Sequence, residues 1–201
     1  MTFLEKAGLK VDLSIENIVD NIWTTRPAPP QPPIFLHEEW AGKSITEKVG
    51  WVRDHIDKKG GNAAIFNDLS EIAWIVNLRS SEIPHNPFFK SVLIIRKEGG
   101  SLYLPKEHPS LKSEEIKEHL GKVGIKLEPY EPVFDDKSLI KKSALNYYVY
   151  NSIKDREPIE WDGIGLYRAV RTDKEMQGFR RCHIADGIAM AKFWSWRSKL
   201  D

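Results

Sequence analysis

The polar side chains best suited to chemistry in this chain lie in one loop, between residues 79 and 86. Four of them carry charge, donors or acceptors: Arg79, Glu82, His85 and Asn86. Pro84 and Pro87 each fix φ near about −65° and favour an extended residue before them, so the loop is predicted to be rigid. A rigid polar loop between apolar segments commonly presents side chains to a cleft or a partner. We therefore take these four residues as possible cleft or partner contacts.

A structural role for the same loop is the alternative. Arg79 would then pair with Glu82, or with the carbonyl groups around Pro84 and Asn86. Arg79 follows an apolar helix, and the C-terminus of a helix stabilises a cation, so we expect this guanidinium to be partly buried and paired. His85 could also change charge near neutral pH.

Other patterns predict no catalytic residue and no metal ligand. Cys182 and His183 are adjacent, so on a helix they point about 100° apart and form a poor chelate. The glycines of segment 161–165 lack the third glycine of a dinucleotide-binding loop. Ser195 has no nucleophile-elbow pattern around it. We expect no cofactor in this chain.

Composition limits the possible partners. The chain has 201 residues, 41% of them hydrophobic, and a formal net charge of +1. Such a balance argues against a surface for nucleic acid or for an anionic membrane. No apolar run approaches the ~20 residues of a membrane span. The single cysteine is typical of a reducing compartment, so a cytoplasmic location is expected.

The elements around the loop predict an α/β fold in which helices flank a mixed sheet. Strands are expected at 63–66, 91–97, 102–104, 125–129, 147–150 and 166–168, and also within 7–14. Helices are expected to begin at Ser14, at Ser44 with a capping box, at Asn67 or Asp68, at Ser113, at Asp135–Asp136 and at Thr172. The helix that begins at Ser44 carries the apolar spacing of Ile45, Val49, Val52 and Ile56. The helix that begins at Asn67 or Asp68 is expected to run through Leu78, and the one that begins at Asp135–Asp136 is expected to run through Ile140. Because Gly99–Gly100 predicts a hairpin, the sheet cannot be wholly parallel.

The two ends of the chain differ from the middle. Five prolines mark 24–33 as an extended linker, which places the main domain at 34–168. A long helix is expected from Thr172 to about Lys199. Trp194 and Trp196 lie two residues apart on it and cannot face the same side. We expect Ile188, Trp194 and Trp196 to be exposed or to contact a further domain or another copy of the chain.

Three blocks of the sequence, in this order, resemble one family. The blocks are 18–23 with 26–30, then 77–79 with 82–89, and finally 169–171 with 175–189. They resemble the three-domain form of aminopeptidase P, a Xaa-Pro aminopeptidase of the creatinase and pita-bread metallopeptidase superfamily. In two places the chain departs from the family pattern: Ser80 stands where the family usually has Gly, and Glu82 where it usually has Asp.

The resemblance implies a creatinase N-terminal-like fold for 34–168, the second domain of the family. Residues 1–23 would be a remnant of the preceding domain, and 169–201 the first helix of the pita-bread catalytic domain. That catalytic domain holds two divalent metal ions, Mn or Zn, with two Asp, one His and two Glu that lie beyond Asp201.

Two hypotheses for function follow from the resemblance. In the first, the chain is a truncated Xaa-Pro aminopeptidase, inactive alone, and peptide substrates are bound only by the full-length enzyme. Its partner would be the missing catalytic domain or another copy of the chain. In the second, it is a non-catalytic interaction module, as in the large subunit of the nucleosome-remodelling histone chaperone.

Overall fold

The computed structural model describes residues 7–9 and 17–200, and it divides the chain into two units, Met1–Pro30 and Gln31–Asp201. In the first unit, helix α2 spans Ile18–Ile22. Asn17 caps it by accepting a hydrogen bond from the backbone amide of Val19 at 3.1 Å. The helix predicted from Ser14 therefore begins at Ile18 among the described residues. Ser14 itself, and most of the strand predicted within 7–14, lie outside them.

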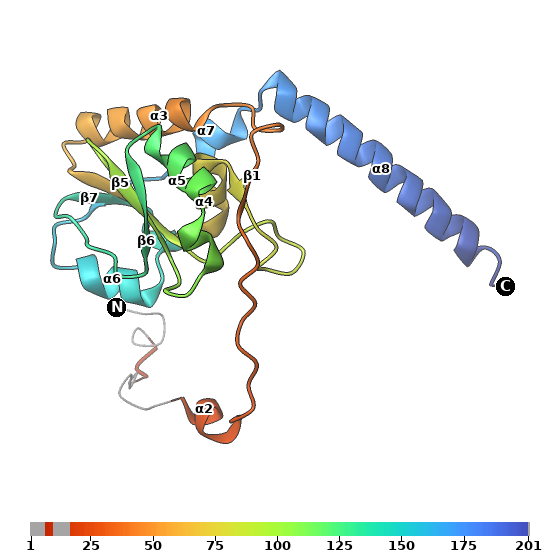
Figure 1. The fold of residues 1–201 in the computed structure, drawn as a ribbon, viewed down its shortest axis with the longest axis horizontal. Coiled ribbons are helices and arrows are strands. Elements are labelled where there is room, and N and C mark those ends of the chain that lie inside the picture. Colours follow the sequence, from red (N-terminus) through yellow and green to blue (C-terminus); the bar gives the residue numbers. More distant parts are fainter. Residues whose placement is uncertain (1–6, 10–16, 201) are drawn as a thin grey trace. The chain divides into compact units, whose positions relative to one another are not determined.

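A six-stranded mixed sheet forms the centre of the second unit (Figure 1). Its order is β6-β5-β4-β2-β7-β8. The strands are β2 (Ala63–Phe66), β4 (Val92–Arg96), β5 (Gly100–Leu104), β6 (Ile125–Pro129), β7 (Ser138–Ile140) and β8 (Ile159–Glu160). Strand β4 is antiparallel to both of its neighbours, while β5 pairs parallel with β6, and β7 pairs parallel with both β2 and β8. Five strands therefore run in one direction and end at the same edge of the sheet.

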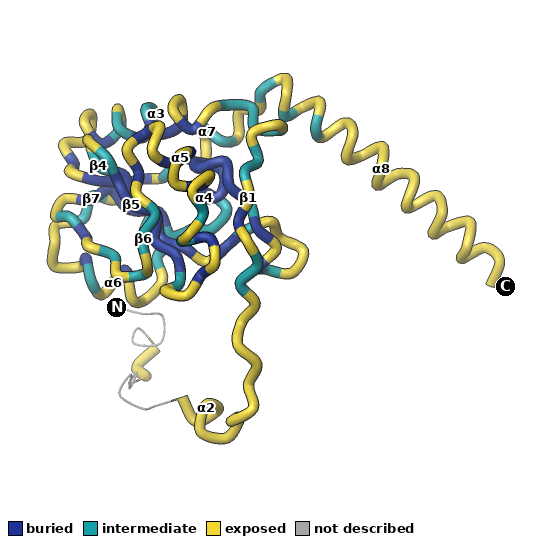
Figure 2. The backbone as a smooth tube through the Cα atoms, in the orientation of Figure 1, coloured by how far each residue is buried: buried dark blue, intermediate teal, exposed yellow. Residues whose placement is uncertain are grey.

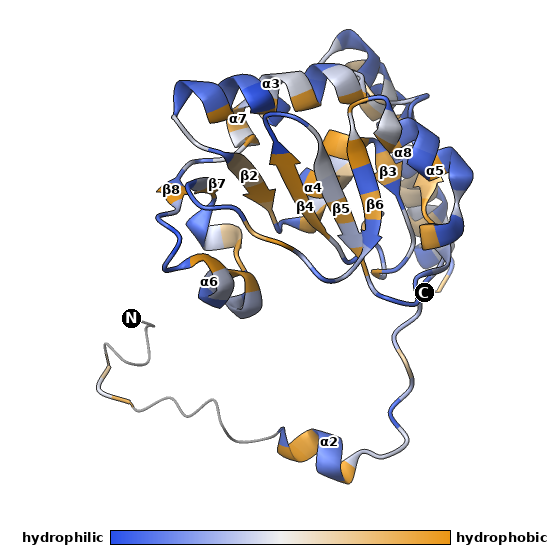
Figure 3. Cartoon of the chain, turned by 60° about the vertical axis from the view of Figure 1, so that its left-hand side comes forward, coloured by the Kyte–Doolittle hydropathy of each residue, from blue (hydrophilic) through white to orange (hydrophobic). Residues whose placement is uncertain are grey.

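Both faces of the sheet are covered, because side chains alternate along each strand. In β2, Ala64 and Phe66 belong to one apolar cluster, and Ala63 and Ile65 belong to the other. Helices α3 (Ile45–Lys58), α4 (Leu69–Val76) and α5 (Glu114–Gly121) pack on the first face. Helix α6 (Tyr147–Ile153) packs on the second. Burial on both faces explains the continuous apolar strands, which Figure 3 shows in orange.

Local capping signals predicted four helix starts correctly. Ser44 and Glu47 form the expected capping box of α3. Asp68 caps α4 and Ser113 caps α5. Thr172 caps the long helix α8 (Asp173–Arg197). Helix α4 ends at Val76 rather than Leu78, because Asn77 takes a left-handed backbone with φ 53°. The next residues, Leu78–Arg79, form strand β3, which pairs antiparallel with β1 (Phe35–Leu36).

Three predicted elements were wrong. The segment after Asp135–Asp136 is not helical: Ser138–Ile140 is strand β7, held between β2 and β8. Tyr147–Ile153 is helix α6 rather than a strand, since Asn146 caps it and it buries Val149 and Ile153. Segment 166–168 belongs to helix α7 (Gly165–Ala169) rather than to a strand. Two 3-10 helices, η1 (Pro109–Lys112) and η2 (Lys142–Ala144), complete the described elements.

Helix α8 differs from the other long elements because none of its residues is buried (Figure 2). Among the helices described, none has the length and the apolar content to cross a membrane.

Candidate functional site

Hydrogen-bond donors from three side chains converge on the C-terminal end of α4. The Nη1 of Arg79 donates to the carbonyl of Ala73 and, at 2.8 Å, to that of Leu78. The ammonium of Lys48 donates to the carbonyl of Trp74 at 2.7 Å. The Nε2 of His119 donates to that of Val76 at 2.8 Å. The last carbonyls of a helix lack intrahelical partners and carry its negative dipole end, so this arrangement stabilises α4.

Lys48 is the most unusual member of this cluster, since it lies in the buried stripe of α3 and is only 2% exposed. Its ammonium also donates to Oδ1 of Asn77 and lies 4.1 Å from the centre of the Trp74 ring. Burial, reinforced by the nearby charge of Arg79, lowers the pKa of Lys48 from 10.5 to about 7. At neutral pH this lysine is therefore close to half protonated.

Arg79 is half-buried, as the sequence predicted, but its partners differ from those expected. No hydrogen bond or ion pair joins it to Glu82, nor to the carbonyls of Pro84 or Asn86; it bonds instead to the end of the helix before it. Burial lowers the pKa of the guanidinium below its usual value, and the charge of Arg168 acts in the same direction.

Glu82 is buried, and it holds the far end of the loop. Its Oε2 accepts a hydrogen bond from the backbone amide of Lys90 at 2.7 Å, and its Oε1 lies 3.1 Å from the Lys90 ammonium. The side chain of Glu82 is 0% exposed and that of Lys90 is 50% exposed, so solvent reaches only the lysine side of this pair. His108 lies nearby: burial lowers its pKa, and the charge of Glu82 opposes that shift.

The tip of the loop presents His85 and Asn86 to solvent. The Asn86 amide nitrogens bond within the loop: the backbone N–H donates to Ile83 O at 3.0 Å and Nδ2 donates to Pro84 O at 3.2 Å. His85 adopts φ 63°, whereas Ser80 keeps a negative φ and donates from its hydroxyl to Pro32 O at 3.1 Å. The structure thus separates the four candidate residues into an inward pair, Arg79 and Glu82, and an exposed pair, His85 and Asn86.

The first turns of α8 are seated on segment 38–42. Glu175 Oε1 accepts from Trp74 Nε1 at 3.5 Å, and the Arg181 guanidinium lies 4.6 Å from the Trp40 ring centre. A Cβ added at Gly42 would lie 2.0 Å from the Thr172 hydroxyl oxygen, so only glycine permits this approach. Burial of Glu175 works against its ionisation, but its hydrogen bonds to Thr172 outweigh that effect and lower its pKa.

The distal part of α8 is apolar and exposed. Ile188, Trp194 and Trp196 are 53%, 61% and 57% exposed. The Phe193 ring lies 5.5 Å from that of Trp194 and 5.9 Å from that of Trp196. Large exposed aromatic groups of this kind mark surfaces that meet a partner.

The residues present do not fit a dinuclear metal centre. Within 7–9 and 17–200, no three His, Cys, Asp or Glu side chains come together in a way that could hold a metal ion. Cys182 is exposed and makes no disulfide. No metal-dependent step is therefore assigned to these residues.

Sequence reasoning assigned no role to Asn77, although it lies in one of the family blocks, and it missed Lys48, His119 and Glu175 as site residues. Lys48 could have been noticed, because it lies three residues after Ile45 and next to Val49 on a stripe where a charged side chain needs a buried partner. The partners of His119 and Glu175 lie 43 and 101 residues away in sequence, and no local pattern predicts such contacts.

The sheet, the helices that cover its two faces and the capped end of α4 define an α/β domain without a metal centre among its described residues. The sequence profile of the creatinase/prolidase N-terminal domain matches residues 25–175. The chain therefore belongs to the creatinase/prolidase N-terminal domain family.

Relatives of this chain are named as probable Xaa-Pro aminopeptidases P, the family that the sequence resembles. A probable Xaa-Pro aminopeptidase P of Sordaria macrospora is 32% identical over 94% of this chain and 34% of the relative. One of Talaromyces stipitatus is 34% identical over 96% of this chain and 32% of the relative. The chain thus spans about a third of the length of these relatives. The predicted resemblance to aminopeptidase P is confirmed.

The fold also matches a solved structure, the X-prolyl aminopeptidase of Caenorhabditis elegans, described as a cytosolic enzyme with a di-nuclear active site. The TM-score is 0.81 at 26% identity, over 98% of this chain and 34% of the other. The predicted creatinase N-terminal-like fold, with its long C-terminal helix, is confirmed.

Proposed function

We propose that this chain supplies the second, non-catalytic α/β domain of a Xaa-Pro aminopeptidase, an enzyme that removes an N-terminal residue preceding proline. One observation carries the proposal: the match to the C. elegans aminopeptidase covers 98% of the chain, so it includes α8 as well as the domain. In this reading residues 1–23 continue a preceding domain, 24–33 link it to 34–168, and 169–201 begin the catalytic domain.

The contribution of the domain would be structural: it would hold helix α8 in position. Helix α8 is held at its base by Trp74, Trp40 and Gly42, and it presents its apolar far end, with Ile188, Trp194 and Trp196, to the catalytic domain. The exposed pair His85 and Asn86 would face the cleft or a neighbouring domain. Two divalent metal ions would be bound by the catalytic domain, where they would activate the water that attacks the peptide bond.

The same proposal has two consequences, one for the cellular location of the chain and one for its activity. One cysteine in 201 residues suits a reducing compartment, and the C. elegans relative is described as cytosolic, which supports a cytoplasmic enzyme. We expect the chain alone to bind no stoichiometric metal and to cleave no Xaa-Pro peptide, since its described residues form no metal-binding group.

A second candidate function is an interaction module that keeps the fold without the peptidase. The exposed aromatic group of Phe193, Trp194 and Trp196 favours it, because an unpartnered surface of this kind could dock on another protein or on a second copy. The open reading frame after Asp201 separates the two candidates: a frame that encodes two Asp, one His and two Glu as metal ligands supports the enzyme.

A chimera tests the first proposal directly. These 201 residues would replace their counterpart in the T. stipitatus relative, which matches 96% of the chain. We expect hydrolysis of Xaa-Pro peptides and binding of two metal ions per chain. A folded, metal-loaded chimera without activity would contradict the proposal, and a parallel chimera with Gly42→Val should lose activity because α8 cannot seat.

A further inference from the structure

A pocket of about 710 Å³ opens at the edge of the sheet where the five parallel strands end. Asn67 follows β2, Pro105 follows β5, Tyr130 follows β6, and the η2 turn follows β7. Strand β4 runs the other way and begins here at Val92. Ligands of open α/β sheets bind outside the carboxyl ends of the strands, and this volume lies within the range of small-molecule sites.

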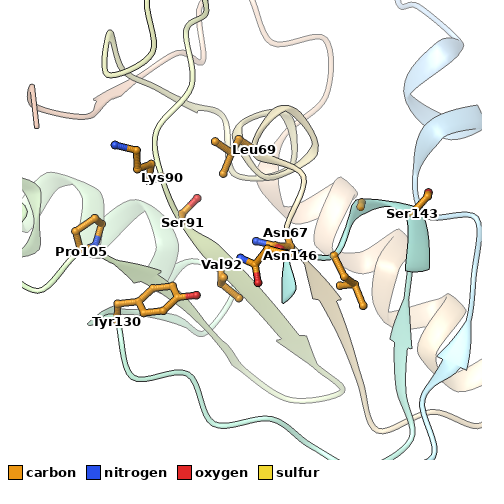
Figure 4. Close-up of a pocket in the computed structure, with 11 residues that line it drawn as sticks. Asn67, Leu69, Lys90, Ser91, Val92, Pro105, Tyr130, Ser143 and Asn146 are labelled. Atoms are coloured by element: carbon orange, nitrogen blue, oxygen red, sulfur yellow. The ribbon is translucent and has the colours of Figure 1, made fainter. Parts of the chain in front are cut away.

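The lining combines an apolar part with neutral hydrogen-bonding groups (Figure 4). Leu69, Val92 and Pro105 supply apolar surface. Asn67 and Asn146 lie side by side in the middle of the view, with Tyr130 farther out to the left and Ser143 farther out to the right. Burial, and then the neighbouring Tyr148, raise the pKa of Tyr130, so its hydroxyl stays neutral at physiological pH.

Two of these polar groups remain available to a ligand. The Oδ1 of Asn67 accepts from the backbone amide of Asn146 at 2.7 Å, which fixes the Asn67 side chain. The Nδ2 of Asn67 and the hydroxyl of Ser143 make no hydrogen bond to any described residue. A fixed amide donor suits the carbonyl of a peptide group, which accepts a hydrogen bond.

The charge of the site excludes other ligand classes. Among the described residues that line the pocket, Lys90 is the only charged one, and its ammonium is paired with buried Glu82 at 3.1 Å. A nucleotide or phosphate would need more unpaired cationic groups or a glycine-rich backbone cradle. A metal ion would need carboxylate or imidazole ligands, and the lining has neither.

We propose that this pocket binds an uncharged stretch of peptide, with an apolar side chain against Leu69, Val92 and Pro105 and a peptide carbonyl that accepts a hydrogen bond from Nδ2 of Asn67. The proposal goes beyond the proposed function, because the pocket belongs to the α/β domain and needs neither a metal ion nor peptidase activity.

Amide NMR spectra of the isotope-labelled chain test the proposal. The probe is acetyl-Gly-Leu-Gly-amide, and we expect saturable shifts at Asn67, Ser91 and Asn146 with a dissociation constant of about 0.1–1 mM. Acetyl-Gly-Gly-Gly-amide, which lacks the apolar side chain, should bind at least about fivefold more weakly. Shifts confined to other regions, equal binding of the two peptides, or binding of adenosine monophosphate in preference to both would overturn the proposal.

Three variants assign the binding to the pocket. Ser143→Trp fills the pocket from an exposed turn position and should abolish the shifts. Lys142→Trp adds the same bulk one residue earlier, outside this lining, and should bind as the wild type does. Asn67→Asp keeps the acceptor for Asn146 but removes the donor, and should weaken binding about fivefold. Wild-type affinity of a folded Ser143→Trp variant would refute the assignment, whatever the outcome of the chimera experiment.

Discussion

The polar loop and the C-terminal helix were both candidate contact surfaces, yet they use their side chains in opposite ways. In the loop, Arg79 and Glu82 turn inward and satisfy backbone groups of the domain. In α8, Trp194 and Trp196 turn outward and contact only their neighbour Phe193 among the described rings. The charged residues of the loop are thus part of the fold, and the apolar residues of α8 are the ones that remain exposed.

This difference follows from what each kind of side chain needs. A guanidinium or carboxylate can be buried only if its donors or acceptors are satisfied, and the end of α4 and the amide of Lys90 provide such groups. An exposed indole has no comparable local partner and contributes free energy only when another surface covers it. Charge in a loop is therefore a weak indicator of function, and an exposed aromatic cluster is a stronger one.

The largest expected effect is that of Arg79→Ala. The variant loses a half-buried guanidinium that caps two carbonyls, so the free energy of unfolding should fall by about 3 kcal/mol in chemical denaturation. His85→Asn is the matched control at the exposed tip; Asn tolerates the left-handed backbone of His85, so stability should change by less than about 0.5 kcal/mol. Equal effects of the two changes would remove the distinction between the inward and exposed pairs.

A pH series on Lys48→Met examines the same buried cluster. The pKa of Lys48 is 10.5 when exposed and about 7 in the fold, so between these values the unfolded chain binds more protons than the folded one. The unfolding free energy of the wild type should therefore rise with pH relative to that of the variant, by about 1.4 kcal/mol per pH unit within this window. Denaturation of both proteins at about pH 7.5 and pH 9 measures this slope, and a flat difference would show that Lys48 keeps its ordinary pKa.

A smaller loss is expected for Glu82→Gln. The amide still reaches the backbone of Lys90, but the buried charge opposite the Lys90 ammonium disappears, and stability should decrease by about 1 kcal/mol. Glu131→Gln provides the control, since it removes a carboxylate from an exposed pair with Lys106 and should leave the denaturation midpoint unchanged. A midpoint for Glu82→Gln equal to that of the control would mean that the loop is not held by this carboxylate.

Sequence predicted those parts of the fold that local signals determine. Ser44, Asp68, Ser113 and Thr172 each satisfy amides within three residues, so their helices were placed correctly. Strand β7 was missed because its three residues are extended only through pairing with β2 and β8, which are distant in sequence.

For the candidate site, sequence located the loop but not the direction of its side chains. Arg79 bonds to Ala73 rather than to Glu82 because α4 ends three residues before it, and the carbonyls at that end carry the negative end of the helix dipole. That end is fixed by the left-handed backbone of Asn77, which in turn is held by Lys48 and by the carbonyl of Lys43. These contacts depend on the packing of α3 against α4, which no spacing in the loop reveals.

The double variant Trp194→Ser/Trp196→Ser should have the smallest effect on stability and the clearest effect on association. Both indoles are more than half exposed, so the free energy of unfolding should change by less than about 0.5 kcal/mol. If these rings attract a second copy, sedimentation velocity should show a concentration-dependent dimer for the wild type and a monomer for the variant. Tyr147→Ser is the matched control, because Tyr147 is as exposed as Trp194, at 61%, but lies on α6. An equal loss of self-association in this control would mean that any exposed aromatic residue suffices and that the end of α8 is not a distinct contact surface. A wild type that is monomeric at every concentration would instead leave the catalytic domain as the partner that these indoles fit.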